Sequence, residues 1–172
     1  MKKSVTLSGL EKLTHYWPFL LFAGLTLWSV YVMLVITNIA KPERVFYIFY
    51  FCAPVSIIFY VIQKRRLKYT VVTTTLTPAE IDAVLLKLEA GKGWKRKRKT
   101  PFIYIATTYG GLLSGSWGER ITIEQSGGMV YMNSICDPAK PSSVTSWGRN
   151  KKNVTAFKHQ IALQEKKKQP LV

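Results

Sequence analysis

The chain has 172 residues and a formal net charge of +16, with 25 Lys and Arg against 9 Asp and Glu, yet 48% of its residues are hydrophobic. The two Cys and two His stand singly, which excludes a disulfide framework and a Cys–His zinc site, so we expect no metal and no cofactor. Such a high apolar content beside so much charge predicts a chain divided into an apolar part and a basic part.

Two apolar runs occupy the N-terminal part of the chain. No Lys, Arg, Asp or Glu occurs from Leu13 to Ala40 or from Val45 to Gln63. A membrane-spanning helix needs about 20 such residues, and both faces of each run are apolar, which argues against a buried pair of soluble helices. We therefore predict a transmembrane hairpin, with an N-terminal segment at 1–15, helices at 16–38 and 45–63, and a short external loop at 39–44.

Positive charge flanks the predicted hairpin on the side of both chain termini. Three Lys precede the first run, and a cluster of four cations follows the second: Lys64, Arg65, Arg66 and Lys68. The connecting loop has only two cations beside one Glu. This bias predicts that both termini are cytoplasmic, in a membrane of the bacterial inner-membrane type. Neither run carries a charge at mid-depth, so we interpret the hairpin as an anchor or assembly surface and not as a complete pore.

The basic remainder, residues 64–163, predicts a small cytoplasmic domain. β-Branched residues at 69–75 indicate a strand. A helix follows, with Thr77 as its N-cap, Glu80 completing a capping box, and Gly91 or Gly93 at its end. Its apolar stripe consists of Ile81, Val84, Leu85 and Leu88.

The second half of the domain predicts three strands and a helix. Residues 102–108 alternate as a strand does, and residues 119–135 form a hairpin that turns at Gly127 and Gly128. A helix is predicted at 147–163, and residues 164–172 are predicted to be a disordered basic tail. The resulting order, β-α-β-β-β-α, predicts an α+β fold with a mainly antiparallel sheet and both helices on one face.

The tripeptide Ser-Trp-Gly occurs twice, at 116–118 and at 146–148, and a charged residue follows each copy. We interpret the first copy as the end of a Gly-rich loop, 110–118, and the second as a helix start. The loop lacks the Gly-Lys-Ser/Thr ending of a phosphate-binding P-loop. The functional alternative is that the two loops meet and form a pocket or a partner contact. Its candidate residues are Trp117, Arg120, Trp147, Arg149 and Asn150.

The basic clusters are the strongest chemical signal of the domain. From Lys64 onward the chain has 20 Lys and Arg against 7 Asp and Glu. The cations that directly follow the hairpin are explained by topology, but the unbroken run Lys95, Arg96, Lys97, Arg98 and Lys99 repels itself and is relieved by an anionic surface. We therefore predict that both clusters bind anionic lipid headgroups.

Nucleic acid is the competing partner for this charge. Three aromatic residues near the basic run, Trp94, Phe102 and Tyr104, could stack on bases. Phe102 and Tyr104 alternate as the buried face of a strand does, however, and a membrane tether suits a genome-binding role poorly. We favour lipid over nucleic acid.

We assign no catalytic residue. His159 is the only His of the domain, and no paired carboxylates or Ser/His/Asp set accompanies it. The sequence favours a membrane-anchored binding or accessory subunit, not an enzyme, whose basic domain engages a protein partner or anionic lipid. Two alternatives stay open: a small transport or channel component that forms a homo-oligomer through its hairpin, and a tethered enzyme with a pocket between the Ser-Trp-Gly loops.

Overall fold

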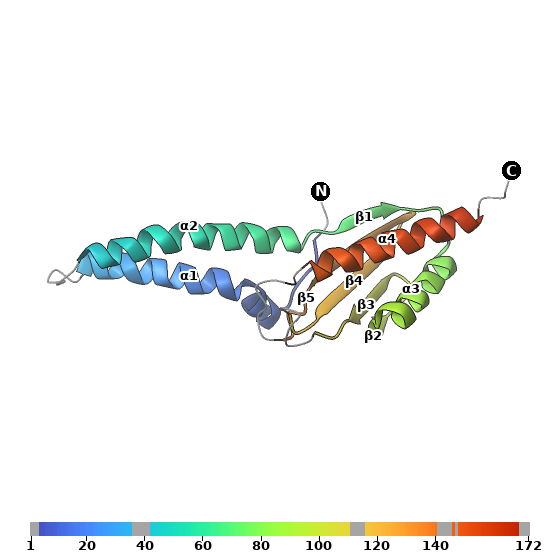
Figure 1. Cartoon of the computed structure of the whole chain (residues 1–172), viewed down its shortest axis with the longest axis horizontal. Helices are drawn as coiled ribbons and strands as arrows, with labels where there is room; N and C mark the ends of the chain where they lie inside the picture. Colours follow the sequence, from blue (N-terminus) through green and yellow to red (C-terminus); the bar gives the residue numbers. More distant parts are fainter. Residues whose placement is uncertain (1–3, 36–41, 111–115, 141–145, 147, 169–172) are drawn as a thin grey trace. The chain divides into compact units, whose positions relative to one another are not determined.

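The computed structural model describes residues 4–35, 42–110, 116–140, 146 and 148–168. The chain divides into two units, Leu7–Arg65 and Arg66–Val172, the second of which also contains Met1–Thr6. Each unit is considered by itself, and its elements are labelled in Figure 1.

The first unit is a pair of long helices, α1 (Gly9–Val35) and α2 (Pro42–Arg66). A capping box starts α1, because Ser8 N donates to Glu11 Oε2 at 2.9 Å and Glu11 N donates to Ser8 Oγ at 3.5 Å. Aromatic rings join the helices: Phe22 stacks on Phe59, with ring centroids 5.5 Å apart. His15 Nε2, earlier in α1, lies 3.1 Å from Gln63 O, later in α2. The two helices are therefore antiparallel.

Most side chains of this unit point away from the helix pair. Only 17% of the most apolar 18-residue window of each helix is buried, whereas the core helix of a soluble protein is mostly buried. Large apolar residues such as Leu27, Leu34 and Ile57 are more than 60% exposed. Both helices are therefore long and apolar enough to cross a membrane.

The second unit is an α+β domain built on a five-stranded antiparallel sheet with the order β1-β5-β4-β3-β2. Its strands are β1 (Thr70–Thr73), β2 (Lys95–Lys99), β3 (Ile103–Thr107), β4 (Glu119–Ser126) and β5 (Met129–Cys136). The predicted β-hairpin of residues 119–135 is confirmed. Gly127 and Gly128 have φ of 56° and 74°, as a two-residue turn between β4 and β5 requires.

The sheet has one strand more than the sequence predicted, because the basic run is itself β2. All five of its residues are exposed, so the strand has no inward apolar alternation by which to recognise it. It lies at the sheet edge and pairs only with β3. Its register shifts between Arg96 and Arg98, which leaves Lys97 as the extra residue of a bulge. Charge and a bulge on an edge strand disfavour pairing with another chain.

Helices α3 (Pro78–Lys92) and α4 (Arg149–Lys168) cover one face of the sheet (Figure 1). Thr77 caps α3 with a complete capping box and Gly93 ends it at φ 64°, as predicted. The four stripe residues of α3 are each at most 3% exposed. They pack in one core with Tyr104, Ala106, Ile121, Ile123, Val130, Met132, Phe157 and Ile161.

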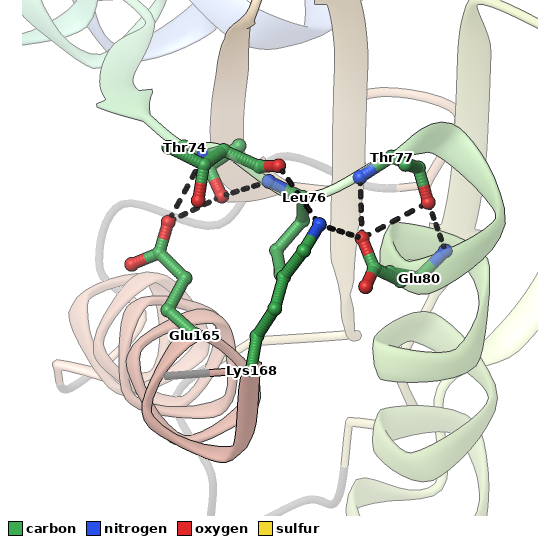
Figure 2. Close-up of polar contacts among 7 residues, drawn as sticks. Thr74, Leu76, Thr77, Glu80, Glu165 and Lys168 are labelled. Carbon is green, nitrogen blue, oxygen red and sulfur yellow. Dashed lines mark hydrogen bonds and ion pairs between the residues drawn. The ribbon is translucent and has the colours of Figure 1, made fainter. Parts of the chain in front are cut away.

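The prediction that α4 ends at Leu163 is wrong, because the helix continues to Lys168 and residues 164–168 are ordered within it. Figure 2 shows Glu165 and Lys168 reaching from α4 to the segment between β1 and α3. Glu165 Oε1 accepts hydrogen bonds from Thr74 Oγ1 at 2.6 Å and from Thr75 N at 3.2 Å. Lys168 Nζ lies 3.2 Å from Glu80 Oε2, within the capping box of α3. These contacts stabilise the last turns of α4, whose composition alone suggested a frayed end.

Candidate functional site

The two Ser-Trp-Gly segments meet through the charged residues that follow them. Glu119, after the first copy, is fully buried, and its Oε1 lies 3.2 Å from Nε of Arg149, after the second copy. The Oγ atoms of Thr108 and Ser116 also donate to the carboxylate, Ser116 at 2.6 Å. Arg149 in turn donates through Nη2 to Tyr109 O. The carboxylate thus has three donors, and the cluster ties β4 and the end of β3 to the start of α4.

Backbone packing explains the glycine of the first copy. Gly118 has φ 121°, and a Cβ there would lie 2.3 Å from Thr108 O. A Cβ on Gly110 would lie 2.1 Å from Ser116 O, so the two ends of the Gly-rich loop are pressed together. Lys140 Nζ donates to Trp117 O at 2.7 Å and closes the group. These contacts give Ser116–Gly118 a structural role at the end of the Gly-rich loop.

The other proposed pocket residues are only partly brought together. Trp117 is 53% exposed, and Arg120 lies on β4 opposite Thr107 and Ile135. Asn150 lies in the first turn of α4 and accepts a hydrogen bond from Ser134 Oγ at 3.1 Å. Trp147 lies outside the described residues. A polar cleft containing Glu119 or Arg149 would strengthen the enzyme hypothesis, and neither residue is among those that line the two cavities described below. The enzyme hypothesis stays untested.

The basic run of β2 is partly neutralised inside the domain. Arg96 donates through Nε and Nη2 to the two carboxylate oxygens of Glu89 on α3, both at 2.8 Å, and Lys99 Nζ lies 2.7 Å from Asp82 Oδ2. Hydrogen bonds from Arg96 hold the pKa of Glu89 below its usual value, with Tyr104 Oη as a further donor at 2.9 Å. The self-repulsion that suggested a lipid contact is thus relieved in part by α3.

A cleft of about 650 Å³ lies between the end of α3 and the first half of α4. The two helices are antiparallel, because Lys168 at the end of α4 pairs with Glu80 in the first turn of α3. Further along, Lys87 Nζ donates to Gln164 Oε1 at 3.2 Å. The cleft begins at the next residue of α3, Leu88. Its titratable lining is entirely basic. The lining residues are Leu88, Lys92, Gly148, Lys151, Lys152, Thr155, Ala156, His159 and Gln160.

A second hollow, of about 240 Å³, lies where the chain leaves α2 and enters β1. It is lined by Arg66, Lys68, Thr70, Met132, Asn133, Ser134, Asn150, Lys151 and Val154. Nδ2 of Asn133 donates to Arg66 O at 2.7 Å and to Lys68 O at 3.0 Å. Half of the first predicted basic cluster, Arg66 and Lys68, therefore lines this hollow, whereas Lys64 and Arg65 are not among its lining residues.

Sequence reasoning named Arg66, Lys68 and Asn150 but missed the other polar residues of the two cavities. Asn133 and Ser134 occur inside a strand pattern, and Lys92 and Lys152 look like ordinary surface charges. Their shared positions depend on pairings between distant elements, for which no local signal exists. Among the described residues, no group of three His, Cys, Asp or Glu side chains could hold a metal ion.

Comparison of the chain with known protein families, curated proteins and solved structures finds no match.

Proposed function

We propose that the protein is a membrane-anchored binding subunit whose basic domain holds an acidic segment of a protein partner in the cleft between α3 and α4. In this proposal α1 and α2 span the bilayer and both chain termini are cytoplasmic. The observation that carries the proposal is the lining of the cleft, in which every titratable residue is basic.

The anchoring is supported by the surface of the helix pair. Leu27, Trp28, Leu34 and Phe51 are each more than half exposed. Soluble monomers rarely expose apolar patches above a few hundred Å², since each Å² left in water costs about 25 cal/mol. A bilayer removes this cost. The cations at the end of α2 and before α1 then favour the cytoplasmic side for the domain.

The cleft suits an extended acidic segment better than a small anion. Its lining runs along α4 from Lys151 to Gln160, which at 1.5 Å per residue is about 14 Å of helix, and Gly148 extends it before the start of α4. Lys92 adds a cation from α3 on the opposite wall, while Leu88 and Ala156 provide apolar floor. Spaced cations over an apolar floor complement a peptide in which acidic and apolar residues alternate.

The test measures binding of a defined peptide to the full chain in nanodiscs of neutral phosphatidylcholine. The probe is a fluorescent peptide of repeated Glu-Glu-Leu, and a Lys-Lys-Leu peptide is its control. We expect the acidic peptide to bind and the basic one not to bind. Lys92→Glu combined with Lys152→Glu should weaken binding at least tenfold, because two attractions of up to about 1 kcal/mol each are lost and replaced by repulsions.

A matched variant separates the cleft from general charge. Lys166→Glu combined with Lys167→Glu makes the same change of net charge at exposed positions of α4 outside the cleft. It should leave most of the affinity intact. Equal weakening by the two double variants, or no binding of the acidic peptide to the unaltered chain, contradicts the proposed function.

A further inference from the structure

We propose that the hollow at the junction of α2 and β1 binds the headgroup of one anionic phospholipid that carries hydroxyl groups. The inference rests on the membrane anchoring proposed above but not on the binding of an acidic segment. The residues that line the hollow belong to the folded domain, which holds them in fixed positions around one hollow.

The covalent chain places this hollow near the membrane surface. α2 ends at Arg66, and Lys68 follows two residues later, at most about 7 Å further along an extended chain. Both residues line the hollow. If α2 spans the bilayer, the basic residues at its end lie among the headgroups, and Arg66 and Lys68 keep the lining of the hollow within two residues of that end.

The charge of the hollow selects an anion. Its titratable lining consists of Arg66, Lys68 and Lys151, with no acidic residue. Lys151 and Asn150 lie in the first turn of α4, a helix of 20 residues, whose N-terminal end carries the positive pole of the helix dipole. Three cations and a helix N-terminus around one small hollow fit a single phosphate group.

Asn133 adds an independent requirement for a hydrogen-bond donor. Its side chain is 3% exposed, and Nδ2 already donates to the carbonyls of Arg66 and Lys68. These two bonds fix the orientation of the amide, since a flip would place oxygen against oxygen. Oδ1 is then a buried acceptor with no partner among the described residues. Buried polar atoms are nearly always bonded. Because Asn133 lines the hollow, we assign a hydroxyl of the bound headgroup as the donor to Oδ1.

Phosphatidylglycerol combines both features, because its phosphate is anionic and its glycerol carries two hydroxyl groups. Phosphatidylmethanol has the same charge and lacks the hydroxyls. Native mass spectrometry of the full chain in detergent, supplied with each lipid in turn, counts the bound molecules. We expect one phosphatidylglycerol to be retained at least fivefold more strongly than phosphatidylmethanol. Equal retention of the two lipids would overturn the proposal.

Two double variants separate the site from general attraction. Arg66→Gln with Lys68→Gln removes two charges from the hollow, and Lys64→Gln with Arg65→Gln removes two charges from the adjacent turn of α2. We expect the first pair to reduce retention at least tenfold and the second to reduce it less than threefold. Equal losses would mean attraction by the surface as a whole and would refute the site.

Two further measurements distinguish the lipid site from a site for free phosphate and from the α3–α4 cleft. An excess of inorganic phosphate should not release the lipid, and release by phosphate would identify a free-anion site instead. Binding of the acidic peptide to the Arg66 and Lys68 double variant should be unchanged, because neither residue lines the α3–α4 cleft. The lipid site and the proposed function can therefore fail separately.

Discussion

Arg149 Nε lies 3.2 Å from Glu119 Oε1, so the charged residues that follow the two Ser-Trp-Gly copies are ion-paired with each other. Glu119 is fully buried, whereas the side chain of Arg149 is 28% exposed. The repeated tripeptide therefore marks two chain segments that the fold brings together, and the pair holds the start of α4 against the sheet.

Removing the arginine should destabilise the domain. Arg149→Met leaves the Glu119 carboxylate buried without its ionic partner, which we expect to cost about 2 kcal/mol, below the roughly 3–5 kcal/mol typical of fully buried pairs. The double variant Glu119→Gln/Arg149→Met should cost less than the sum of the single changes.

Thiol labelling of Cys136 under increasing denaturant reports unfolding, because burial raises the pKa of this thiol and Cys136 pairs with Glu119 across the sheet. Cys52→Ala removes the other thiol. Additive costs would contradict the coupling.

The last turns of α4 should contribute to stability. Truncation after Leu163 removes the hydrogen bonds of Glu165 to Thr74 and Thr75, and we expect the free energy of unfolding to fall by about 1–3 kcal/mol. Truncation after Lys168 retains these contacts and is the matched control. Glu165→Ala should reproduce most of the loss. If both truncated chains unfold at the same denaturant concentration, the contacts in Figure 2 do not stabilise the domain.

The Glu89–Arg96 pair predicts an acid-sensitive component of stability. The pKa of Glu89 is lowered from 4.5 by its hydrogen bonds with Arg96, so the folded state binds this proton less readily than the unfolded state does. The stabilisation is present above about pH 4.5 and is lost as the pH falls through the folded-state pKa. We expect the component to be small, since the Arg96 side chain is 39% exposed and water screens the pair. Denaturant unfolding at several pH values should show a shallower acid dependence in Glu89→Gln; an unchanged slope would contradict it.

The cations of β2 should differ in their contribution to lipid binding. Arg96 and Lys99 are paired with carboxylates of α3, so we expect Lys97 and Arg98 to provide the contact with anionic lipid. For the domain without its hairpin, Lys97→Gln/Arg98→Gln should weaken binding to anionic vesicles roughly thirtyfold, at about 1 kcal/mol per cation. Lys166→Gln/Lys167→Gln is the control for net charge. Vesicle sedimentation measures the affinity, circular dichroism confirms folding, and unchanged affinity contradicts the prediction.

The proposed topology predicts opposite labelling of two engineered cysteines. In a chain without its native thiols, Glu43→Cys should react with a membrane-impermeant maleimide on intact cells, because it lies at the external end of α2. Lys97→Cys should react only after the membrane is permeabilised. Gel-shift detection of the labelled chain gives the result directly. Labelling of Lys97→Cys on intact cells would place the domain outside.

The sequence by itself determined the elements whose signals are local. The capping box of Thr77 and Glu80, the apolar stripe of α3 and the turn at Gly127 and Gly128 depend on residues within one or two turns of each other. The two long apolar helices are equally local, because length and composition define them. These features could be predicted since the interactions that stabilise them join near neighbours in the chain.

Only the tertiary structure decided where the charges act. A run of five cations has no apolar alternation, so it becomes a strand only because β3 offers a free edge and α3 presents Glu89 and Asp82. The pairing of Glu119 with Arg149 joins residues thirty positions apart, and Asn133 meets the end of α2 from a strand more than sixty residues away. Such contacts follow from strand order and helix packing, because sequence distance carries no information about which distant side chains the register brings together.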